Sequence, residues 1–146
     1  MAQPVLERLS EPVPAIDTAL RDEWLAAIER LNADITEWVS SQPGWSIVRE
    51  PDKMIQEERI GSYKAPFLRL QSKKPKGEVR LEPMARMTRG GRGVVELYAW
   101  PALYSVRLIG NARGSSWEIL TDSGIFIRQP WNKETFLQVA EDLIRA

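Results

Sequence analysis

The chain contains neither cysteine nor histidine. Without cysteine there is no disulfide framework, no thiolate nucleophile, no zinc–thiolate site and no iron–sulfur cluster. Without histidine the chain lacks the side chain that most often performs acid–base catalysis near neutral pH, and also the commonest metal ligand. Ser–His–Asp and Cys–His chemistry are therefore excluded on a single chain. We expect a protein that is not an enzyme and holds no metal and no cofactor, with a carboxylate-only enzyme as the remote alternative.

Long apolar runs are also missing. The longest stretches without a charged side chain, residues 38–48 and 97–106, are much shorter than the roughly 20 apolar residues of a membrane span. The first residues are polar and show no apolar segment typical of a signal peptide. These patterns predict a cytoplasmic protein with no membrane association.

The net charge is zero, but the charges are sorted along the sequence. Residues 1–58 carry 5 basic and 12 acidic side chains, a net charge of −7. Residues 59–92 carry 10 basic and 2 acidic side chains, a net charge of +8. A charge distribution of this kind can orient a charged partner, or it can stabilise the chain itself through internal pairs.

Two segments have helical periodicity. Apolar residues recur every three or four positions from Ile16 to Trp38, which predicts a long amphipathic helix over about 16–40. Near the C-terminus, Asn132 is suited to be an N-cap, and Trp131 and Phe136 are spaced as a hydrophobic staple. A second helix is therefore expected at the end of the chain.

The middle of the chain alternates apolar and polar residues, as strands with one buried face do. Turn signals at 74–77, 89–93, 110–114 and 122–124 separate these strands and imply antiparallel neighbours. Weaker strand patterns lie at 45–49 and over about 55–70, the latter interrupted by Gly61 and Pro66 and expected to be bent or at an edge. We predict a single α+β domain over 1–146: a long N-terminal amphipathic helix, an antiparallel meander sheet of about five to seven strands and a C-terminal helix packed on the sheet, with 1–14 as an extended arm.

Six basic residues crowd two predicted turns and are candidates for contact with an anion or a nucleic acid. They are Lys73, Lys74, Lys76, Arg86, Arg89 and Arg92. If they converge they can neutralise phosphates, with Tyr63 available for base stacking. Turns joined by one strand fall at opposite ends of a meander, however, and lysines and arginines also keep turns and edge strands soluble.

An aromatic pair beside a strand break is the second candidate site. If Val95, Leu97 and Ala99 face the core, alternation places Tyr98 and Trp100 on the other face, just before Pro101 removes a backbone donor. Tyr and Trp are enriched in interface hot spots, so this pair is a candidate anchor for a protein partner. The alternative is that a helix covers that face.

These observations favour a non-catalytic protein-interaction domain, such as an adaptor, an inhibitor, an immunity-type partner or a self-associating subunit. It would use charge complementarity and an aromatic anchor, and its partner would be another protein or a second copy of the chain. The alternative is a nucleic-acid-binding module that uses the basic segment 64–92. A small-molecule substrate is not expected.

Overall fold

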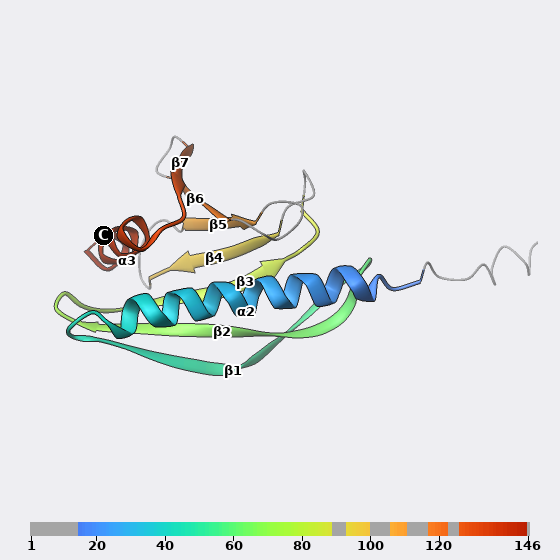
Figure 1. Cartoon of the computed structure of the whole chain (residues 1–146), viewed down its shortest axis with the longest axis horizontal. Coiled ribbons are helices and arrows are strands. Elements are labelled where there is room, and N and C mark those ends of the chain that lie inside the picture. The colour runs from blue at the N-terminus through green and yellow to red at the C-terminus, as the bar shows by residue number, and fades with distance from the viewer. Residues whose placement is uncertain (1–14, 89–92, 100–105, 111–116, 123–125, 146) are drawn as a thin grey trace, which may run out of the picture.

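A computed structural model describes residues 15–88, 93–99, 106–110, 117–122 and 126–145 (Figure 1). One helix lies near the start of the described chain and another near its end, with antiparallel strands between the two helices. The predicted α+β class with a helix at each end is therefore confirmed. The helices are α2 (Thr18–Ser40) and α3 (Lys133–Arg145). The strands, which pair with their sequence neighbours in the order β1 to β7, are β1 (Trp45–Glu57), β2 (Gly61–Lys73), β3 (Lys76–Ala85), β4 (Val94–Tyr98), β5 (Val106–Gly110), β6 (Trp117–Asp122) and β7 (Phe126–Pro130).

The first helix begins two residues later than its apolar pattern suggests. Asp17 is the N-cap, and its side chain accepts a hydrogen bond from the amide of Leu20 at 3.0 Å. Ile16, the first member of the predicted stripe, therefore lies outside the helix and is 41% exposed. The rest of the stripe is largely buried, including Trp24 and Ile28.

The second helix has the predicted cap and staple. The Asn132 side chain accepts a hydrogen bond from the Thr135 amide at 2.8 Å, and the rings of Trp131 and Phe136 lie 5.4 Å apart. Trp38 of α2 packs 5.0 Å from Trp131, so the same aromatic cluster joins the end of α2 to the start of α3.

Both helices pack on the same face of the sheet, where α2 runs along β1 and β2 and α3 contacts β3 (Figure 1). Buried residues of both helices and of alternate strand positions form one core. Its largest members include Trp24, Ile28, Leu31, Ile35, Leu70, Leu81, Leu97, Ile119, Phe136 and Leu143. The expected inward direction of Val95, Leu97 and Ala99 is confirmed, since all three are buried.

The segment predicted as one bent or edge strand over 55–70 is divided differently. The chain turns at residues 58–60, and Gly61 begins β2 with a positive φ of 77°. The residues before the turn belong to β1, and β2 is an interior strand between β1 and β3. The expected edge position is met in part: β2 pairs with β3 only over Leu68–Lys73, so Pro66, which lacks an N–H, has a strand neighbour on the β1 side alone. There it lies opposite a β-bulge of β1 that contains Pro51 and Asp52.

Candidate interaction surface

The sheet has a polar face on the side opposite the helices, which we call the open face. It is defined here by Glu50, Arg69, Glu78, Arg80, Glu82 and Tyr98, which alternate with the core residues of β1 to β4. In the described part of the chain no helix packs on this side, because α2 and α3 share the opposite one. The alternative in which a helix covers the face of Tyr98 is therefore wrong for the described helices.

Glu78 is the centre of an ion-pair lattice on the open face. Arg69 and Arg80 lie directly opposite one another on β2 and β3, an arrangement that would be repulsive by itself. The carboxylate of Glu78 accepts from Arg69 Nη1 at 3.0 Å and from Arg80 Nε at 3.1 Å, so it separates the two guanidinium charges. Arg69 Nε also donates to Glu50 on β1. The lattice therefore fixes both arginine side chains across three strands.

The lattice changes the proton affinity of Glu78. Partial burial acts to raise its pKa, but hydrogen bonds from Arg80, Gln71 and Arg69 outweigh that effect, and the pKa of Glu78 is lowered. The hydrogen bond to Glu50, and after it the one to Glu78, raises the pKa of the Arg69 guanidinium, and the hydrogen bond to Glu78 raises that of Arg80. All three groups are therefore charged at neutral pH.

Tyr98 lies on the open face beside this lattice, directly opposite Arg80. Its hydroxyl donates to Glu82 Oε2 at 3.2 Å, and Glu82 Oε1 is 3.2 Å from Lys53 Nζ of β1. Burial, followed by the negative charge of Glu82, raises the pKa of Tyr98. The tyrosine is half-buried and fixed at its hydroxyl end, whereas its predicted companion Trp100 lies outside the described residues.

Three of the predicted basic residues lie at one turn. Lys73 ends β2, Lys76 begins β3, and the two face each other in register across Lys74 and Pro75; we call these four residues the lysine turn. Its three lysines are exposed and form no ion pair with the rest of the described chain. A depression of about 460 Å³ lies beside the turn. It is lined by Ser46, Gln71, Ser72, Lys73, Lys76, Gly77 and Glu78.

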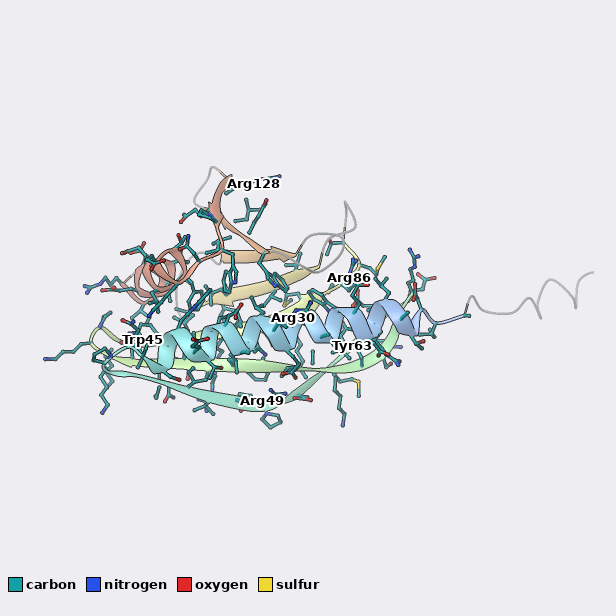
Figure 2. The ribbon with its side chains drawn as sticks, viewed as in Figure 1. Arg30, Trp45, Arg49, Tyr63, Arg86 and Arg128 are labelled. Carbon is teal, nitrogen blue, oxygen red and sulfur yellow. The ribbon has the colours of Figure 1, made fainter. Side chains whose placement is uncertain are left out.

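Arg86 lies at the other end of β3 and is 6% exposed. It follows directly after the ten residues of β3, the first of which is Lys76, so Arg86 lies about 30 Å from the lysine turn at the usual rise. Figure 2 shows the same separation: Arg86 and Tyr63 lie toward the start of α2, and Trp45, which pairs with Ser72, lies toward its end. The described members of the predicted basic set therefore do not form one patch, and Arg89 and Arg92 lie outside the described residues.

Tyr63 is not available for base stacking, because it is 5% exposed. Its hydroxyl donates to Glu57 Oε2 at 2.5 Å and accepts from Trp24 Nε1 at 3.2 Å. Glu57 also accepts from the backbone amides of Arg86 and Met87, at 3.1 Å and 2.8 Å. This buried network fastens the segment after β3 to the β1–β2 hairpin, which is a structural role.

The comparisons with known proteins give no family. No protein-family model, curated protein or solved structure matches the chain. No helix in the described residues is long and apolar enough to cross a membrane. Within the same residues, no group of three or more His, Cys, Asp or Glu side chains could hold a metal ion.

Proposed function

We propose that the chain is a non-catalytic protein-interaction domain that binds another protein through the open face of its sheet. The observation that carries this proposal is the fixed position of Arg69, Arg80 and Tyr98 on a face that no described helix covers. Arg and Tyr are enriched in interface hot spots. Side chains already held by Glu78 and Glu82 lose less conformational entropy on binding than free ones.

The pattern of charge on the open face favours a protein over a nucleic acid. Glu50, Glu78 and Glu82 lie among the arginines, so a phosphate backbone following the strands would meet carboxylates as well as cations. The described members of the predicted basic set, the three lysines of the lysine turn and Arg86, are also divided between the two ends of β3. A protein surface carrying both signs of charge complements this arrangement better.

Site-specific photo-crosslinking tests the proposal. A benzophenone amino acid in place of Glu96, which lies opposite Glu82 on the open face, should give one discrete protein adduct in cells of the source organism. The same group in place of Ala33, on the exposed side of α2, is the matched control and should give none. The adduct should disappear in Arg80→Ala and persist in Arg128→Ala, which removes an exposed arginine of β7.

Two results would contradict the proposal. One is an adduct from the Ala33 position and none from the Glu96 position, which would place the binding surface on the helix side. The other is an adduct from the Glu96 position that forms equally well in the wild type, in Arg80→Ala and in Tyr98→Ala. An adduct composed of two copies of this chain would assign the open face to self-association.

A further inference from the structure

The depression beside the lysine turn lies at one end of the open face. Ser46, Gln71 and Glu78 are neighbours across β1, β2 and β3, since Ser46 pairs with Gln71 and Gln71 with Glu78. Lys73 and Lys76 continue the same alternate positions to the turn. Glu78 lines the depression and also pairs with Arg69 and Arg80. The depression is therefore continuous with the ion-pair lattice.

The lysine turn is held from two sides. The amide of Lys73 donates to the carbonyl oxygen of Gly44 at 3.0 Å, which attaches the turn to the segment after α2. On the helix side, Ile144 of α3 packs so closely on Gly77 that a Cβ at Gly77 would lie 2.6 Å from Ile144 Cγ2. The backbone that carries Lys73 and Lys76 is thus supported by both helix ends.

The chemistry of the depression suits an anionic group. Two ammonium groups lie on facing positions with no carboxylate partner in the described chain, and the Ser46 hydroxyl and Gln71 amide add neutral donors. The one carboxylate in the lining, Glu78, is already engaged by Arg69 and Arg80. A bound anion would therefore meet two unneutralised cations.

The size and surroundings of the depression favour an acidic protein segment. A volume of about 460 Å³ accommodates only a short stretch of a partner, since pockets for single small ligands have about 300–1,000 Å³. The acidic α2 of a second copy is the competing occupant, because a two-fold dimer could place α2 of each copy on the lysine turn of the other. Self-association of the chain through Lys73 and Lys76 would therefore overturn the choice of a partner protein.

We infer that the depression binds carboxylate side chains of an acidic segment on the partner protein, with Lys73 and Lys76 as the principal contacts. This inference rests on the proposed function, since it names the chemistry of the partner for one end of the open face. Lys74, at the tip of the turn, adds to the attraction at longer range.

A direct binding assay tests the inference. The full chain is titrated against a fluorescein-labelled peptide of alternating Asp and Glu, with anisotropy as the readout, and in parallel against a labelled oligothymidylate. We expect saturable, salt-sensitive binding of the peptide, with amide shifts at Gln71, Lys73 and Glu78 in spectra of the labelled protein. Lys73→Glu combined with Lys76→Glu should weaken binding at least about tenfold, because two attractions become repulsions.

Lys64→Glu is the matched control. Lys64 is an exposed lysine on the same strand, β2, but it lies at the opposite end, where it pairs with Met54. Its reversal should change the peptide affinity by less than about twofold. Equal weakening by Lys64→Glu, or no saturable binding, would overturn the inference. Tighter binding of oligothymidylate through Lys73 and Lys76 would also overturn it and assign the depression to nucleic acid.

The two proposals can fail separately. If the acidic peptide does not bind but the Glu96 crosslink still forms, the open face binds a protein and only the role of the depression is wrong. If the peptide binds at Lys73 and Lys76 but no crosslink forms from Glu96, the depression takes an acidic ligand while the proposed use of the open face fails.

Discussion

Replacement of Gly93 by alanine should destabilise the fold strongly, because the core ring of Trp24 lies against the glycine. A Cβ at Gly93 would be 2.2 Å from Trp24 Cζ3, 2.5 Å from Cη2 and 2.9 Å from Cε3. An ordinary carbon–carbon contact is about 3.5–4.0 Å, so the ring would have to move by more than about 1 Å. It cannot do so freely, because Trp117 packs 5.8 Å away and the indole N–H is bonded to Tyr63.

The expected magnitude follows from these constraints. Overpacking of a core costs about 1–3 kcal/mol, and loss of the buried indole hydrogen bond adds about 1–3 kcal/mol. The reduced entropy of the unfolded chain returns about 0.4–1 kcal/mol. We therefore expect a net loss of about 2–4 kcal/mol in the free energy of unfolding, measured by urea denaturation followed by tryptophan fluorescence.

Gly77→Ala is the matched control, since it also brings a Cβ against a side chain. Its contact, Ile144 Cγ2 at 2.6 Å, is a methyl group of a half-buried side chain in the last turn of α3, and the end of a helix shifts more easily than a ring in the core. We expect it to cost less than about 1.5 kcal/mol. If Gly93→Ala proved as stable as the wild type, or more stable than Gly77→Ala, the assigned packing of Trp24 would be wrong.

Three further changes test other parts of the structure. Tyr63→Phe removes the hydroxyl shared by Glu57 and Trp24, so it should cost about 1–3 kcal/mol of unfolding free energy in the same urea assay; a neutral result would contradict the buried network. Asn132→Ala removes the cap of α3 and should cost about 1 kcal/mol, whereas Asn132→Asp should retain most of the stability. The lowered pKa of Glu78 means that its ion pairs stabilise the fold above the ordinary carboxyl pKa and that this stability is lost as pH falls through the lower folded-state value. Glu78→Gln should therefore be less stable than wild type at pH 7, and the gap should narrow in acid; a gap that is constant with pH would refute this.

The helices were predictable because their signals are local. The spacing of apolar residues in α2 and the cap and staple at Asn132 depend on neighbours within four residues, and the structure confirms both. The start of α2 was predicted too early because Ile16 continues the periodicity, whereas the N-cap at Asp17 makes the helix begin at Thr18.

The β1–β2 hairpin was not predictable in the same way. The turn at residues 58–60 has no glycine, proline, asparagine or aspartate, and Ile60 within it is completely buried. Only Gly61 marked the reversal, and a single glycine also suits a bulge. The local pattern therefore suggested one interrupted segment where two long strands exist.

The lattice on the open face was missed for a different reason. Arg69, Glu78 and Arg80 are ordinary charged positions of alternating strands, and their contacts depend on the register of β2 against β3. The sequence marks which residues face away from the core but not which of them lie opposite each other. The burial of Tyr63 likewise depends on a contact with Trp24, which lies 39 residues away in the sequence.

The structure gives the sorted charges a physical meaning. Acidic residues of the first segment pair with basic residues of the second: Glu50 with Arg69 across β1 and β2, and Asp17 with Arg59 at the start of α2. Part of the opposite charge is therefore neutralised within the domain. The lysine turn is different, since none of its three lysines has an ion-pair partner in the described chain. The residues after α2 and the last turn of α3 lie beside the turn but supply no such partner. A cationic group left unneutralised on a supported turn, at the end of a face whose other charges are paired, is where an acidic partner gains most from binding.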